Sequence, residues 1–284
     1  MDSNKRRHVG HRRDNTVLPL AAGVAVVAAS CLTLFVKALL KRNSKPTQKQ
    51  GKGREGGSAP KSPGAGAYVR GMREREYVRL IPDVEMLSLQ SLLRRIQKAR
   101  GWQFRDDAAR DQAWARVLAT AQSAAGGAWP LDFTPNDVTP EQLQALCDAV
   151  EAEFLGGLLA EQVRRAGRPR IRVVLGVDPR DPYSWLSGLH EDNTIFVNSN
   201  RWREEVSQDN PLVFEGALCR SKLEALAHTL GHELTHAVVL NFFPAMDASS
   251  PAYTPDDKHG PVFMWLNRRL FGHVGHASKR LFNT

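Results

Sequence analysis

The pentapeptide at residues 232–236, His-Glu-Leu-Thr-His, places two histidines four residues apart in the middle of an apolar run. Apolar residues at helical spacing over 221–240 predict a helix through it. Residues four apart share one face of a helix, so His232 and His236 can both reach one metal ion. Glu233, next to the first histidine, can take a proton from a water at that ion. The alternative is a pair of core histidines without a metal, and the helical context favours the metal site.

The source of a third ligand follows from the remaining histidines. Catalytic zinc sites usually have three protein ligands and leave one position for water. His228 lies one turn before His232, and three histidines over two turns of a straight helix cannot converge on one ion. We therefore expect His228 to support the site or to pack beside it. His259 is the better candidate, because a polar loop turns into an apolar helix there and Gly260 allows close approach of the backbone.

These motifs resemble a known family. The segment 224–240, followed by a loop and then by His259-Gly260-Pro261-Val262-Phe263, resembles the SprT-like zinc metalloproteases, which include the Spartan proteases. The resemblance implies Zn²⁺ held by His232, His236 and His259, with Glu233 as the catalytic base. It also implies an α+β, zincin-like fold in which the active-site helix packs on a small β-sheet.

The order of elements before the metal-binding helix fits this expectation. Thr139, Pro140 and Glu141 predict the start of a helix, with threonine as the cap and proline at the first position. The elements expected after it are a helix ending near Gly167, a strand over 171–175, and paired strands over 184–190 and 194–198. We expect residues 190–192 to form a polar hairpin turn, and Tyr253 is not included in the site.

Two features depart from the family pattern. The loop over 241–258 is long and indicates an insertion between the second and third histidines. Many family members carry a cysteine-rich zinc ribbon after the catalytic part, whereas no cysteine follows His259 here. Cys31, Cys147 and Cys219 are scattered, without the paired spacing of a structural zinc site or a disulfide framework. The sequence therefore gives no direct support for binding to nucleic acid.

Residues 17–36 contain no charged side chain, and twenty such residues are long enough to cross a bilayer. We expect a basic tail over 1–16 and a transmembrane helix over 17–40. A signal peptide cleaved at Ala28-Ala29-Ser30 and an organelle transit peptide are the alternatives. More positive charge follows the apolar run than precedes it, so the positive-inside rule predicts a single-pass membrane protein with a cytosolic catalytic domain.

Charge divides the chain into two parts. Residues 1–80 contain 17 Lys and Arg against 5 Asp and Glu, which leaves 22 basic and 25 acidic residues in 81–284. The net charge of +9 therefore comes from the tail and does not indicate a DNA-binding enzyme surface. We expect residues 41–80 to form a flexible basic linker. Beside a membrane, such a linker would contact anionic lipid. A linker that only aids solubility is an equal alternative.

The remaining chain divides into a helical N-terminal extension over 81–139 and a SprT-like metalloprotease domain over 140–284. The expected function is a membrane-tethered, zinc-dependent metalloendopeptidase that hydrolyses peptide bonds in a protein or peptide substrate. One alternative is a soluble or nuclear SprT-like protease that acts on DNA-bound proteins. Another is a non-enzymatic, membrane-attached binding module with a structural zinc. Glu233 argues against the last, because a structural site needs no base.

Overall fold

The central element of the fold is the helix that carries the pentapeptide. The computed structural model describes residues 74–124, 129, 133–179, 187–198, 206–253 and 258–275, all within one unit that spans Lys61–Thr284. Helices predominate, and the described residues include two small sheets, so the expectation of an α+β fold is confirmed. The expected boundary between an extension and a catalytic domain, at 139/140, falls inside this unit.

The expectation of a single-pass membrane protein is corrected. Within the described residues, no helix is both long enough and apolar enough to cross a membrane. The long helices α4 (Asp83–Arg100) and α5 (Asp107–Ala124) carry charged residues along their length because one face of each meets water. The expected tail (1–16) and span (17–40) lie outside the described residues, and so does the linker as far as residue 73.

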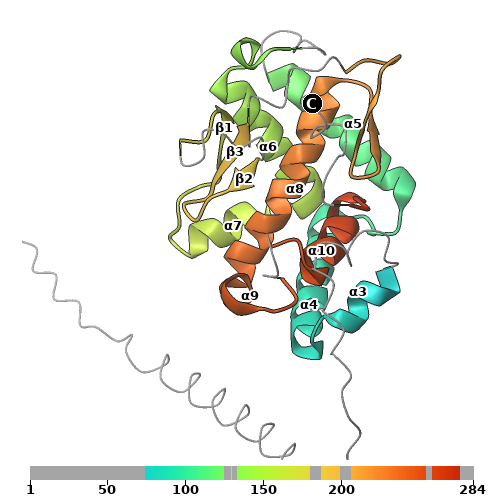
Figure 1. Ribbon diagram of the computed structural model, residues 1–284, viewed down its shortest axis with the longest axis vertical. Helices are drawn as coiled ribbons and strands as arrows, with labels where there is room; N and C mark the ends of the chain where they lie inside the picture. Colours follow the sequence, from blue (N-terminus) through green and yellow to red (C-terminus); the bar gives the residue numbers. More distant parts are fainter. Residues whose placement is uncertain are drawn as a thin grey trace, which may run out of the picture. The chain divides into compact units, whose positions relative to one another are not determined.

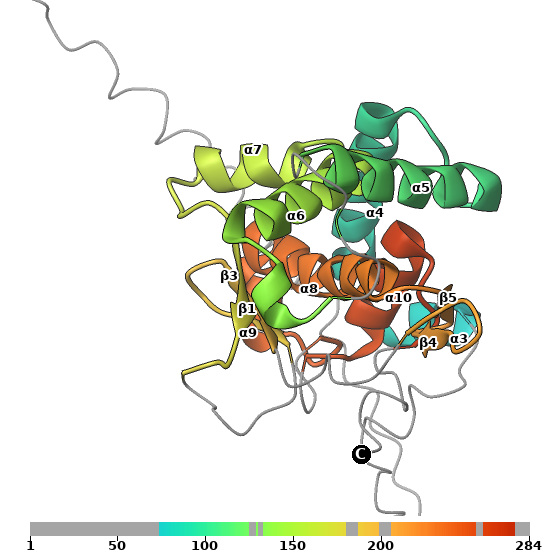
Figure 2. The ribbon, with the colours of Figure 1, turned by 90° about the horizontal axis from the view of Figure 1, so that it is seen from above.

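Helix α8 (Lys222–Phe242) begins at Ser221, whose side chain accepts a hydrogen bond of 3.2 Å from the backbone N–H of Glu224. It is buried on nearly all sides, which is why its sequence is apolar around most of the helix. Figures 1 and 2 show α5, α6 (Pro140–Leu155) and α7 (Leu158–Arg165) as a layer that covers one side of α8. The helix is therefore a rigid, central support for the side chains that it carries.

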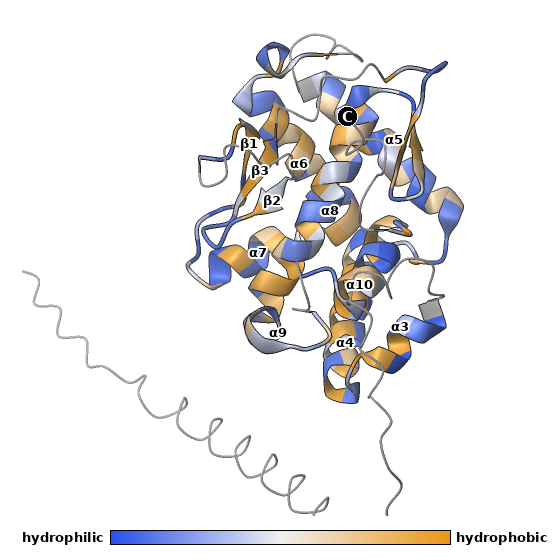
Figure 3. Ribbon diagram, in the orientation of Figure 1, coloured by the Kyte–Doolittle hydropathy of each residue, from blue (hydrophilic) through white to orange (hydrophobic). Residues whose placement is uncertain are grey.

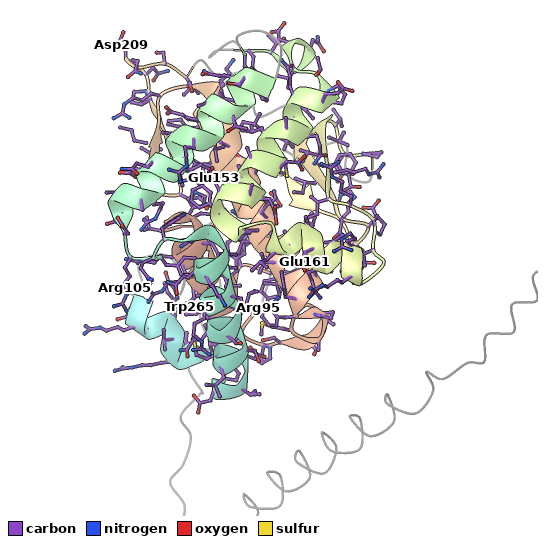
Figure 4. The ribbon with its side chains drawn as sticks, turned by 180° about the vertical axis from the view of Figure 1, so that it is seen from behind. Arg95, Arg105, Glu153, Glu161, Asp209 and Trp265 are labelled. Carbon is purple, nitrogen blue, oxygen red and sulfur yellow. The ribbon has the colours of Figure 1, made fainter. Side chains whose placement is uncertain are left out.

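The predicted start of α6 is present as a complete cap. The hydroxyl of Thr139 accepts from the backbone N–H of Gln142, whose side chain accepts from the N–H of Thr139, and Pro140 occupies the first turn. Helix α6 packs against α5, where the Trp114 and Phe154 ring centroids are 4.3 Å apart. Glu153, labelled in Figure 4, lies on α6 beside α5 and accepts a hydrogen bond of 2.9 Å from Arg116. Residues on both sides of the expected boundary at 139/140 thus share one core.

A three-stranded sheet lies beside α8. Strand β3 (Thr194–Asn198) pairs in parallel with β1 (Arg172–Gly176) and antiparallel with β2 (Gly188–Leu189), in the order β1-β3-β2. The strands expected over 171–175 and 194–198 are therefore present, and only 188–189 of the expected 184–190 are a strand among the described residues. β2 is the edge strand next to α8 (Figure 1).

A short hairpin that the sequence did not predict precedes α8. Its strands, β4 (Leu212–Phe214) and β5 (Ala217–Cys219), are joined by the two-residue turn Glu215-Gly216. Both turn residues have positive φ angles, 50° and 92°, as in the type I′ turns of tight hairpins. A left-handed conformation costs a non-glycine residue about 1–2 kcal/mol, so glutamate at the first position calls for an explanation.

In the part of the chain that the structure describes, two helices follow α8. The long loop expected over 241–258 contains the short helix α9 (Pro244–Ser249), and α10 (Pro261–Phe271) begins directly after Gly260. Proline at the first helical position fits there because the first N–H groups of a helix have no partner within it. α10 packs on α8 and on α3 (Glu74–Leu80), and a single 3₁₀ turn, η1 (Pro135–Asp137), precedes α6. His259, two residues before the first residue of α10, is thereby held against α8.

Candidate metal centre

Three histidines converge where α8 meets the start of α10. Nε2 of His259 lies 3.0 Å from Nε2 of His232 and 3.2 Å from Nε2 of His236. The three side chains each offer one nitrogen, and all three nitrogens lie within 4.8 Å of one another, close enough to hold a metal ion. The helix supplies two of them at i and i+4, and the Gly-Pro start of α10 supplies the third.

The spacing of the nitrogens fits a small tetrahedral ion. Ligand nitrogens about 2.0–2.1 Å from a tetrahedral zinc are about 3.3 Å apart, close to the separations found here. The ring of Phe263, on α10, lies against all three imidazoles, with centroid distances of 4.8 Å to His232, 4.4 Å to His236 and 4.7 Å to His259. This aromatic wall restricts ring rotation and keeps the three Nε2 atoms directed at one point.

Glu215, in the β4–β5 turn, supports the first ligand. Its Oε1 lies 2.7 Å from Nδ1 of His232, so this nitrogen carries the hydrogen and donates it, and Nε2 keeps its lone pair for a metal. Burial raises the pKa of Glu215, but His232 and His273 outweigh it and hold the pKa far below its ordinary value. The carboxylate is thus charged. The strained backbone conformation of Glu215 has an explanation, because it brings the carboxylate to His232.

The same carboxylate is the centre of a buried polar network. Its Oε2 accepts a hydrogen bond of 2.7 Å from Nδ2 of Asn267 and lies 3.0 Å from Nδ1 of His273. Nε2 of His273 lies 2.9 Å from Nδ1 of His228. His228 therefore lies outside the histidine triad and contacts it only through this network, so the third nitrogen at the centre belongs to His259.

Tyr253 supports the second ligand in a similar way. Its hydroxyl oxygen lies 2.8 Å from Nδ1 of His236, where it can accept the hydrogen of that nitrogen. Tyr253 is fully buried, and burial raises its pKa, so the phenol stays neutral. The long loop thus contributes a positioning residue, which the sequence did not reveal because a lone tyrosine in a loop carries no periodic signal.

Two of the three histidines, His232 and His236, have pKa values that favour the uncharged form. Burial, followed by the neighbouring histidines, lowers the pKa of His236 well below 6.5. Burial also lowers the pKa of His232, although Glu215 partly opposes it. Since metals bind neutral imidazole, both shifts favour metal binding near neutral pH.

A cleft of about 240 Å³ opens over the three histidines. Glu233, which is 3% exposed, lines it together with the triad, so the carboxylate next to the first histidine faces the same space. Residues 187–191, which include β2, form another wall of the cleft. Figure 3 shows hydrophilic colour interrupting the hydrophobic colour in the middle of α8, where these side chains lie. The arrangement places a carboxylate, three potential metal ligands and an open cleft together.

Sequence reasoning missed the side chains that support the centre from outside its motifs. Glu215 and His273 lie 17 and 41 residues from His232 in the chain, and only the tertiary fold brings them together. The Glu-Gly pair at 215–216 is a weak turn signal, but it does not identify a partner. His190 was expected to lie in a turn, and it does, but its side chain also lines the cleft.

Comparisons with models of protein families, with curated proteins and with solved structures found no match for this chain.

Proposed function

We propose that this protein is a zinc-dependent endopeptidase with a zincin-like fold, as the resemblance to the SprT-like family implies. The observation that carries the proposal is the presence of Glu233 in the same cleft as His232, His236 and His259. A structural zinc site is closed by four protein ligands, whereas three ligands beside an open cleft are typical of catalytic zinc. A carboxylate next to the open side supplies the base that hydrolysis needs.

Zinc is the metal that suits these ligands best. Three imidazoles with nitrogen separations of 3.0 and 3.2 Å favour a four-coordinate ion, and zinc has no preference that would oppose this geometry. When bound, zinc acts as a Lewis acid that makes water a stronger nucleophile at neutral pH. The carboxylate of Glu215 behind His232 strengthens that ligand, as hydrogen-bonded carboxylates do in other zinc sites.

Glu233 would act as general base and then as general acid. The oxygen of a water in the cleft bonds to the carbonyl carbon of the substrate, and Glu233 takes the proton that this water loses. Glu233 then returns the proton to the amide nitrogen, and the carbon–nitrogen bond breaks to give an amine and a carboxylic acid. The acid passes its proton to the amine, so the products are an ammonium group and a carboxylate. Its burial beside the histidine triad keeps this proton transfer away from bulk water.

The edge of the sheet suits an extended peptide substrate. β2 pairs with β3 on one side, and residues 188–189 also line the cleft. An exposed strand edge presents backbone N–H and C=O groups that an extended peptide can pair with. A peptide aligned along β2 would pass over the histidine triad and Glu233, which favours endopeptidase activity on unfolded or flexible segments.

The proposal is tested with the purified full chain and an unfolded substrate such as reduced casein. Zinc-loaded protein should cleave it, a chelator should stop cleavage, and added zinc should restore it, because the histidines supply the metal site and no other group replaces the ion. Fragments are followed by gel electrophoresis and mass spectrometry. Cleavage that continues unchanged after the metal is removed would show that the proposed chemistry is wrong.

A further inference from the structure

Hydrolysis of a peptide bond needs a partner for the carbonyl oxygen, which gains negative charge as water attacks the carbon. The metal ligands apart, the described side chains that line the cleft include two that can carry a positive charge, His190 and Lys258. Nζ of Lys258 lies 3.0 Å from both carboxylate oxygens of Asp247, which itself lines the cleft, so this ion pair adds no net charge to the cleft. His190 is therefore the group to consider.

The other polar residues of the cleft suit this role less well. Glu191 and Asp247 are acidic and would repel a developing negative charge. Tyr253 is fully buried, and its hydroxyl is engaged with Nδ1 of His236. Ser187 is neutral, and its Oγ accepts a hydrogen bond of 3.4 Å from the backbone N–H of Asn198.

His190 is held in place from outside the cleft. Its Nε2 lies 2.7 Å from Oδ2 of Asp178, which is not among the residues that line the cleft. The ring also packs on Phe196, with centroids 4.6 Å apart, and the backbone N–H donates to the carbonyl of Thr194 across the hairpin. The two side chains of the pair are only 11% and 14% exposed. A histidine in an ordinary exposed turn does not need three such contacts, so the position of the His190 ring calls for a functional explanation.

We propose that His190, oriented by Asp178, is a catalytic residue that donates a hydrogen bond from Nδ1 to the carbonyl oxygen of the peptide bond being cleaved. The inference rests on the proposed peptidase function and adds a substrate contact to it. In the imidazolium form both ring nitrogens carry hydrogen, so Nε2 donates to Asp178 while Nδ1 remains for the substrate. The proton stays on His190, which acts through a hydrogen bond and its charge.

Two walls of the cleft, formed by different elements, carry these groups. Glu233 and the histidine triad lie on the α8 side, and His190 lies at the end of β2. A peptide paired with β2 would bring a backbone carbonyl close to both walls. A donor fixed in advance at that position stabilises the transition state more than the bound substrate, so its loss should lower kcat and leave KM nearly unchanged.

The test compares His190→Ala and Asp178→Asn with the wild type, using a casein-derived peptide that the wild type cleaves. His190→Ala should lower kcat by about 100-fold with KM within about threefold, the usual loss for one oxyanion donor. Asp178→Asn should lower kcat by about 10-fold, since the imidazole stays but is held less firmly. Asp192→Asn is the matched control, because Asp192 lies in the same turn, caps the N–H of Thr194 and does not line the cleft.

A binding measurement separates catalysis from folding and metal content. Zinc-loaded proteins are titrated with a phosphinic analogue of the same peptide, which carries a tetrahedral anionic group, and zinc content is measured in parallel. His190→Ala should retain its zinc and bind the analogue about 100-fold more weakly than the wild type does. Its KM for the peptide substrate should stay close to that of the wild type. Unchanged kcat and analogue binding in His190→Ala would overturn the inference and leave the peptidase proposal intact. A wild type without peptidase activity would overturn both.

Discussion

Oε1 of Glu215 lies 2.7 Å from Nδ1 of His232, and this contact joins a hairpin turn to the metal centre. The glutamate adopts a positive φ of 50°, a conformation that glycine or asparagine would adopt at lower cost. The β4–β5 hairpin therefore has a structural role at the histidine triad, because its turn holds Glu215 against His232. It positions a charged group behind a candidate metal ligand, where the carboxylate fixes the tautomer and the orientation of the ring.

Replacing Glu215 by glutamine should test that role. The amide keeps the size of the side chain but loses its charge, so zinc affinity should fall by about 10–100-fold without loss of the fold. Zinc affinity is measured by competition with a chromophoric chelator. Glu161→Gln, which removes an acid from an exposed ion pair with Arg165 on α7, should bind zinc like the wild type. Equal zinc affinities in Glu215→Gln and Glu161→Gln would contradict the account.

The contact between Tyr253 and His236 leads to a second prediction. Tyr253→Phe removes the hydroxyl but fills the same space, so Nδ1 of His236 loses its 2.8 Å partner. A buried donor without a partner costs about 1–3 kcal/mol, and zinc affinity should therefore fall roughly 10-fold. The far-ultraviolet circular dichroism of the variant should match that of the wild type. Full zinc affinity in Tyr253→Phe would show that the hydroxyl does not support His236.

Metal content distinguishes the third ligand from its neighbour. His259→Ala should lose the zinc that the wild type retains through gel filtration, because two helical histidines alone leave the ion without a third protein ligand. His228→Ala should retain it, since His228 reaches the centre only through His273. Both variants are measured by elemental mass spectrometry. Retained zinc in His259→Ala, or loss in His228→Ala, would require a different ligand set.

The lowered pKa values of His232 and His236 predict how the metal-free protein responds to acid. In the unfolded chain these histidines gain protons below about pH 6.5, whereas in the folded chain burial keeps them neutral. The unfolded state then binds more protons, so stability falls as the pH drops from about 7 to about 5. Urea unfolding of the chelated protein at several pH values measures this. His236→Gln should show a weaker pH dependence, and an unchanged one would contradict the assignment.

The sequence predicts which three histidines come together, because each is tied to a strong local signal. His232 and His236 lie four apart in a helix whose apolar pattern is unmistakable, and His259 precedes a Gly-Pro helix start that fixes its place. The cap at Thr139 and the strands β1 and β3 follow from similar local rules. Where short-range chemistry determines the conformation, the structure agrees with the prediction.

The supporting residues could not be predicted because no local signal marks them. The strands around Glu215 are three residues long, too short to show alternation, and the partner of Glu215 is reached only through tertiary packing. Tyr253 follows an unpredicted helix, α9, within the long loop. The pair of Asp178 and His190 depends on how β2 and β3 pair. Each of these contacts is a property of the assembled fold.

The most direct test of the central claim is the cleavage rate of Glu233→Gln relative to the wild type at equal zinc content. Glutamine fills the same buried position but cannot accept the proton of the attacking water, so the account predicts a zinc-loaded, folded protein whose cleavage of casein falls by at least about 100-fold. A Glu233→Gln protein that holds zinc and cleaves casein at the wild-type rate would contradict the account.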